Sequence, residues 1–169
     1  MRIVVCVKHV PDMQSERRFE GGRLVRGEDD VLNELDENAI EAAVQLKEAE
    51  EDAGREAEVV ALTMGPEDAE DALMRALQMG ADRAYIVSDE FLEGSDVITT
   101  ASVLSVAIAK IADECGPVDL VITGMASLDA MTSMLPGALA AKAHMPLLGL
   151  ARSMSIEDGT VTIERSVDG

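Results

Sequence analysis

The stretch of residues 2–9, RIVVCVKH, decides the fold of this chain. Its apolar residues run from Ile3 to Val7 without a polar interruption, and most of them are β-branched. A continuous run of this kind is typical of a central strand in a parallel sheet, which is buried on both faces. Parallel strands are joined by long crossovers, usually helices, so helices and further strands should alternate along the rest of the sequence.

The sequence beyond residue 9 has this alternation. Three more segments have the length and composition of strands: residues 57–64, 83–87 and 118–123. Helical periodicity occupies residues 37–52, the segment from Gly65-Pro66-Glu67 to Gly80, residues 97–115, and the segment from the end of the loop 124–130 to about His144. This order predicts one α/β domain, residues 1–169, with an open, mainly parallel twisted sheet, helices on both faces and right-handed crossovers.

Two segments outside this alternation are predicted to form antiparallel hairpins. The polar segment 10–30 contains a small one at residues 19–25, and residues 147–156 and 160–165 flank a turn at Glu157-Asp158-Gly159. Helix ends carry signals of their own. We expect Asn33 or Asp36 to cap the first helix, Pro66 to occupy the first turn of the second and Gly80 to end it, and Ser95 or Asp96 to cap the third.

Composition narrows the classes of function. The chain has 33 acidic and 14 basic residues and a formal net charge of −19, which repels nucleic acid and anionic membranes, so neither is expected as a partner. Cys6 and Cys115 lie far apart with no metal-type spacing, which predicts buried thiols in a reducing compartment and no metal site. No apolar run reaches the ~18 residues of a membrane span, and no signal segment opens the sequence, so we expect a cytoplasmic location and no membrane insertion.

A ligand site in such a sheet is expected beyond the carboxyl ends of the strands, where the strand order reverses. That rule selects residues 6–12, 33–36, 63–66 and 123–134. None of them carries a Ser-His-Asp set or a glycine-rich phosphate loop of known spacing. The amides of the helix that follows residue 130, with the hydroxyls of Thr132 and Ser133, could hold a phosphate. The residues alone favour ordinary capping of that helix by Asp129, Thr132 or Ser133 over a phosphate site.

Several of these segments together resemble one protein family. Residues 3–12 (IVVCVKHVPD), 33–48 (NELDENAIEAAVQLKE) and 123–129 (TGMASLD) are similar to the first strand, first helix and nucleotide loop of the electron-transfer flavoprotein beta subunits. The most specific match is TMGP in residues 63–66, followed by ALQMGADR in residues 76–83. Residues 158–169 resemble the hairpin that follows in the family, so the resemblance covers nearly the whole chain.

The resemblance implies a small subunit of a heterodimer without catalysis of its own. In the family, the complex carries electrons from dehydrogenases to a quinone reductase or similar acceptor, and the redox FAD lies mostly on the alpha subunit. The beta subunit holds AMP as a structural ligand, or FAD instead in electron-bifurcating members. Met13 and Leu35 would face the alpha-subunit flavin. The adenine side of the AMP pocket would be Cys6, Asn33, Asp36 and Met64. Its phosphate side would be Thr123, Gly124, Met125, Ala126, Asp129, and the amides of Met131, Thr132, Ser133 and Met134.

The sequence departs from the family pattern in three places. Glu34 replaces the proline that follows the family's asparagine, which predicts a looser first turn of the pocket. The family's loop has the form DGxxGxVP, whereas Ala130 and Ser133 occupy the two glycine positions here, which predicts weaker phosphate binding. The family's further C-terminal arm, which recognises dehydrogenases, is absent from this sequence.

Two other interpretations therefore stay open. One is a stand-alone adenine-nucleotide-binding protein of the universal-stress type, although Gly124 is not followed by that family's second glycine. The other is a truncated domain that has lost both its ligand and its partner.

Overall fold

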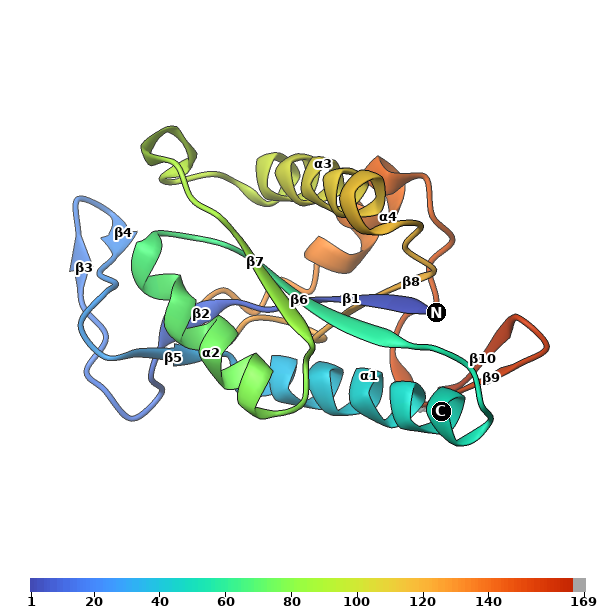
Figure 1. Cartoon of the computed structure of the whole chain (residues 1–169). Coiled ribbons are helices and arrows are strands. Elements are labelled where there is room, and N and C mark those ends of the chain that lie inside the picture. Colours follow the sequence, from blue (N-terminus) through green and yellow to red (C-terminus); the bar gives the residue numbers. More distant parts are fainter. Residues whose placement is uncertain (166–169) are drawn as a thin grey trace.

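Four parallel strands form the central sheet in a computed structural model that describes residues 1–165 (Figure 1). The strand order is β7-β6-β1-β8. The strands are β1 Arg2–Cys6, β6 Glu58–Met64, β7 Arg83–Val87 and β8 Leu120–Thr123. β1 pairs with β6 on one side and with β8 on the other, and its Ile3, Val4 and Val5 are fully buried. The run of β-branched residues is therefore the centre of the sheet, as predicted.

Helices cover both faces of the sheet. On one face lie α1 (Glu34–Asp52) and α2 (Glu70–Gln78), and on the other lie α3 (Val97–Cys115) and α4 (Leu135–Ala143) (Figure 1). Because side chains alternate along a strand, Ile3 and Val5 pack in the α1–α2 core, whereas Val4 and Cys6 pack in the α3–α4 core. The predicted fold class, a parallel α/β sheet with helices on both faces, is confirmed.

The segment between β1 and α1 has more order than its polar sequence predicts. The short strands β3 (Phe19–Glu20) and β4 (Arg23–Leu24) form the predicted small hairpin. At its base, β2 (His9–Pro11) pairs antiparallel with β5 (Asp30–Leu32), a pairing that the sequence analysis did not predict. We call residues 9–32 the excursion. Its β2–β5 base brings the start of α1 back to the end of β1, where the amide of Asn33 donates to the carbonyl of Lys8 at 2.9 Å.

The helix-end signals are mostly confirmed. Asp96 caps α3, since its Oδ1 accepts from the amide of Thr99 at 2.7 Å. Gly80 follows the end of α2 with a φ of 115° and donates to the carbonyl of Leu77. Pro66 precedes a short 3-10 helix, Glu67–Ala69, that leads into α2, and a second such helix spans Glu90–Leu92. Asn33 stands at the start of α1 but makes no capping hydrogen bond with its side chain.

Several predicted boundaries are wrong. The first helix begins at Glu34 instead of residue 37, and the second strand begins at Glu58 instead of residue 57. The fourth strand begins at Leu120 instead of residue 118. The fourth helix begins at Leu135 instead of directly after residue 130, because Met131 and Ser133 both have a left-handed φ of 51°, which a helix cannot contain. In the C-terminal hairpin, β9 spans Ala151–Glu157 and begins four residues later than predicted, since Leu150 has a φ of 59°.

The hairpin itself is confirmed. Strand β10 (Thr160–Arg165) pairs antiparallel with β9 across the turn at Asp158 and Gly159, which have φ values of 50° and 75°. Such positive values at both central residues match the strong Asp-Gly preference of two-residue hairpins. Residues 166–169, the end of the segment that resembles the family hairpin, lie outside the described residues. Within residues 1–165, no helix has the length and apolar character that crossing a membrane requires.

Candidate nucleotide site

The strand order reverses between β1 and β8. From β1 the chain moves outward to β6 and then to β7, and afterwards returns to place β8 on the other side of β1. In an open parallel sheet, a ligand binds in the crevice beyond the carboxyl ends of the strands at such a point. Three predicted site segments meet there: the end of β1 at Cys6, the start of α1 at Asn33 and Asp36, and the loop that follows Thr123.

The side chain of Asn33 fastens the loop to the start of α1. It is fully buried, its Nδ2 donates to the carbonyl of Ala126 at 2.9 Å, and its Oδ1 accepts from the amide of Leu128 at 3.0 Å. Because a buried amide without partners is costly, these two bonds fix the loop at residues 126–128. Asn33 therefore shapes the wall of the site instead of standing at its surface.

Asp36 is buried at the bottom of the site, with 6% of its surface exposed. The amide of Lys8 donates to its Oδ2 at 2.8 Å. Burial raises the pKa of Asp36 to about 6, against the opposing effect of hydrogen bonds with Asn33, Lys8 and Gly124. Gly124 passes so close that a Cβ at its position would lie 2.2 Å from Oδ1 of Asp36. A side chain at position 124 is therefore incompatible with this packing.

Cys6 contributes a neutral thiol. Burial, with a smaller contribution from the negative charge of Asp36, raises the pKa of Cys6 to about 12. Because a cysteine nucleophile must be a thiolate, this side chain is inert at neutral pH. Cys6 lies on the α3–α4 side of β1 and fills the core beneath the site.

Asp129 is held by two cations. Only 2% of its side chain is exposed, and Nζ of Lys8 donates to its two carboxylate oxygens at 2.8 and 3.0 Å. The guanidinium of Arg26, from the excursion, also donates to Oδ2 of Asp129. Burial acts to raise the pKa of Asp129, but hydrogen bonds and charge from Lys8, Ser127 and Arg26 outweigh it and hold the pKa well below its usual range. Asp129 is consequently an anion. The cap position of α4 is Met134, so the alternative that Asp129 caps this helix is wrong.

The outer part of the loop is exposed. Met125, Met131 and Met134 each expose more than half of their surface, and Thr132 and Ser133 are exposed as well. The amide of Met131 donates to the carbonyl of Ser127 at 2.7 Å, as the amide of Ala130 does at 3.1 Å. The expectation that the amides of residues 131–134 are all free for a phosphate is therefore wrong at Met131. Met134 occupies the cap position of α4 and makes no capping hydrogen bond with its side chain. The alternatives that Thr132 or Ser133 caps this helix are therefore wrong as well.

The last predicted residue, Met64, lies on the β6 side of β1, where it packs against the α3–α4 core that includes Cys6. It ends β6 and is half-buried, and β1 stands between β6 and β8. The structure thus brings Cys6, Asn33, Asp36, Gly124, Ala126 and Asp129 together at one edge of the sheet. It places Met64 on the opposite side of β1.

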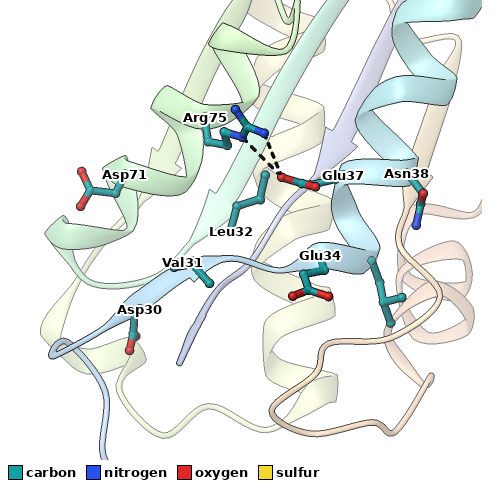
Figure 2. A pocket seen from close by; sticks show the side chains of 9 residues that line it. Asp30, Val31, Leu32, Glu34, Glu37, Asn38, Asp71 and Arg75 are labelled. Atoms are coloured by element: carbon teal, nitrogen blue, oxygen red, sulfur yellow. Dashed lines mark hydrogen bonds and ion pairs between the residues drawn. The ribbon is translucent and has the colours of Figure 1, made fainter. Parts of the chain in front are cut away.

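A cavity of about 730 Å³ lies beside this group, between the start of α1, β5 and α2 (Figure 2). Leu35 lines it, as do the acidic side chains of Asp30, Glu34 and Glu37. The only cation in its lining, Arg75, is paired with Glu37 at 3.4 Å. So acidic a cavity repels a phosphate. The crevice between β1 and β8 is therefore the better candidate for an anionic ligand. Among residues 1–165, no cluster of metal-ligating side chains is present.

Comparison with known proteins shows which family the chain belongs to. A family model described as "Electron transfer flavoprotein domain" matches residues 22–169. The chain belongs to the electron transfer flavoprotein family. It is 40% identical over 169 residues to the electron transfer flavoprotein subunit beta of Mycobacterium tuberculosis (strain ATCC 25618 / H37Rv), in an alignment that covers 98% of this chain and 62% of that protein.

Two further relatives belong to the same family. The electron transfer flavoprotein subunit beta of Megasphaera elsdenii is 36% identical, with 98% of this chain and 61% of that protein covered. The caffeyl-CoA reductase-Etf complex subunit CarD of Acetobacterium woodii is 35% identical, with 99% and 62% covered. The chain thus spans 61–62% of the length of these three relatives.

Two charged residues of the site, Lys8 and Arg26, were missed in the sequence analysis of this electron transfer flavoprotein family member. Lys8 is the first residue after the buried run of β1, and its place at a carboxyl strand end was a usable signal. Arg26 lies in the polar excursion, about one hundred positions before Asp129 in the sequence, and no motif or periodicity marks it. Only the β2–β5 pairing brings Arg26 to the site.

Proposed function

We propose that this chain is the small subunit of a heterodimeric electron transfer flavoprotein and binds AMP as a structural ligand between β1 and β8. In this proposal it has no catalysis of its own and acts in the cytoplasm. With an alpha subunit, which carries most of the redox FAD, it helps to move electrons from dehydrogenases to an acceptor. Support comes from the family membership and from relatives that are named as subunits of such flavoproteins.

The main support for a bound nucleotide is the conformation of the loop 124–134, which lies where the strand order reverses. Its inner half is fixed by Asn33, Gly124 and Asp129, so its shape exists before any ligand arrives. In its outer half, Met131 and Ser133 have left-handed φ values on either side of Thr132, whose φ is not positive. The amide of Met131 is bonded to Ser127, so the candidate donors to an anion are the amides of the exposed residues 132–134 just before α4. We therefore assign the nucleotide phosphate to this exposed half of the loop.

The inert chemistry of the site supports a binding role over a catalytic one. The Cys6 thiol is protonated at neutral pH, and the Asp129 carboxylate is covered by two cations. An enzyme of acyl or phosphoryl transfer needs an accessible nucleophile or base. AMP held as a structural ligand needs only shape and charge.

The decisive experiment is an analysis of what the purified chain carries. The protein is purified without added nucleotide, its ultraviolet–visible spectrum is recorded, and the ligand released on denaturation is identified by chromatography with mass detection. AMP at near one per chain supports the proposal, and FAD instead of AMP identifies an electron-bifurcating type. A nucleotide-free chain that also fails to bind added AMP refutes the ligand, and hydrolysis of a nucleotide by the pure chain supports the universal-stress alternative.

A substitution tests the position of the phosphate. Thr132→Asp places a negative charge on the exposed half of the loop, and we expect AMP affinity to fall about tenfold or more. Thr160→Asp in the C-terminal hairpin is the matched control, and its AMP affinity should equal that of the wild type. Equal affinities in both variants would remove the phosphate from this loop.

A further inference from the structure

Three basic side chains converge on the segment Ser127–Leu128–Asp129. Lys8 and Arg26 bind the Asp129 carboxylate, and Arg17, also from the excursion, donates to the carbonyl of Leu128 at 3.2 Å. In a chain with 33 acidic and only 14 basic residues, a meeting of three cations at one edge of the sheet calls for a physical reason.

Burial separates the cations from the carboxylates. The Asp129 side chain is 2% exposed, whereas the side chains of Lys8 and Arg26 are 41% and 36% exposed. The second carboxylate nearby, Asp36, is also buried and meets only the backbone amide of Lys8 from within. A ligand that approaches from solvent therefore meets positive groups at this point, with the negative groups behind them.

The guanidinium of Arg26 is held before any ligand binds. Its Nη2 donates to Asp129, and its Nη1 donates to the carbonyl of His9 at 3.4 Å. The side chain thus spans from β2 to the loop that follows β8. Binding through a group that is already ordered loses less conformational entropy than binding through a free surface arginine, and a planar guanidinium can still present its remaining N–H donors to a phosphate.

We propose that Lys8 and Arg26, held by Asp129, form the phosphate-binding pair of the nucleotide site. The inference rests on the proposed nucleotide site and adds two residues that recognise the phosphate by charge. Among the side chains that converge here, the cations Lys8, Arg17 and Arg26 outnumber the carboxylates Asp36 and Asp129 by one, which suits a phosphate monoester such as that of AMP. Arg26 then determines specificity for a nucleotide over its nucleoside.

The test compares AMP with adenosine. Both are titrated by calorimetry into the wild-type chain and into Arg26→Gln. We expect the variant to bind AMP about tenfold to hundredfold more weakly, because a charge-assisted hydrogen bond is lost. Adenosine, which lacks the phosphate, should bind both proteins with affinities equal within about twofold. Arg26→Lys keeps the charge without the planar fork and should recover part of the AMP affinity.

Arg23→Gln provides the matched control. Arg23 lies in the same excursion, is 66% exposed and pairs with Glu93 at 2.8 Å, so the substitution removes the same charge away from the site. Its AMP affinity should stay at the wild-type value. Circular dichroism and the urea midpoint of each variant establish that it is folded.

Each other outcome decides against the inference or separates it from the proposed function. If Arg26→Gln weakens AMP and adenosine equally, Arg26 only shapes the loop, and unchanged AMP affinity likewise overturns the pair. If the wild type binds neither AMP nor adenosine, the proposed nucleotide binding is refuted, and the phosphate-binding pair needs a separate test. The pair is then tested with inorganic phosphate, followed by NMR shifts of the residue 126–134 amides. Shifts in the wild type that are lost in Arg26→Gln support the pair, and no shifts in the wild type overturn it.

Discussion

Replacing Gly124 with alanine would put a methyl group where the start of α1 already lies. The new Cβ would stand 2.2 Å from Oδ1 of Asp36, 2.9 Å from the carbonyl oxygen of Leu35 and 3.0 Å from its carbonyl carbon. Carbon atoms in ordinary contact lie about 3.5–4.0 Å apart. Two of the three obstructing atoms belong to the backbone, which cannot turn away as a flexible side chain can.

The expected cost combines strain with lost hydrogen bonds. An extra methyl group in a tightly packed place costs about 1–3 kcal/mol. If Asp36 moves to relieve the contact, its bond from the Lys8 amide weakens, at a further cost of about 1 kcal/mol. We therefore expect Gly124→Ala to lower the free energy of unfolding by about 2–4 kcal/mol, and to lose nucleotide binding.

Urea unfolding followed by far-ultraviolet circular dichroism measures this change, since the chain has no tryptophan and a single tyrosine to serve as fluorophore. Gly137→Ala is the matched control. A Cβ at Gly137, inside α4, meets nothing within 4 Å, so that variant should gain about 0.5–1 kcal/mol from helix propensity. A Gly124→Ala protein as stable as the wild type would refute the packing of the loop against α1.

Two further substitutions test the backbone and the electrostatics of the site. Ser133→Gly should stabilise the chain by about 0.5–1 kcal/mol, because glycine adopts the left-handed φ of this position without strain. Residue 130 has no positive φ, so Ala130→Gly should destabilise the chain by a similar amount. The reverse order in urea midpoints would contradict the loop conformation. Folding raises the pKa of Asp36 from 3.8 to about 6, so the stability that this group contributes is full below about pH 4 and is lost as the pH rises through 6. Asp36→Asn does not titrate and should gain about 1 kcal/mol relative to the wild type between about pH 5 and about pH 7, a range above the isoelectric point of about 4.2. Parallel stability curves for the two proteins would count against the raised pKa.

The sheet could be predicted from sequence because its signals are local. The run Ile3–Val7 is apolar throughout and mostly β-branched, which is typical of an interior strand between two helix layers. The Asp158-Gly159 turn and the Asp96 cap are also set by neighbouring residues. Each of these features depends on a few consecutive positions, so each was placed within a few residues.

The candidate site was predicted only in part because its determinants are distant in sequence. The motif resemblance selected Asn33, Asp36 and Asp129, and these do meet. It gave no information on Arg26, which reaches Asp129 only through the β2–β5 pairing. Helical periodicity, in turn, extended the fourth helix over residues 131–134, because it carries no signal for a left-handed φ at Met131 and Ser133.

The long sequence separations across the site determine when the site forms during folding. Asn33 and Ala126 are 93 positions apart, and Lys8 and Asp129 are 121 apart. β8 is the last strand to join the sheet along the chain and takes an edge position beside β1. Contacts so distant in sequence carry a large entropic cost of loop closure and tend to form late in folding. The crevice therefore exists only after β8 has docked, and a ligand bound there stabilises fully folded chains alone. Occupancy of the site would thus report that folding is complete.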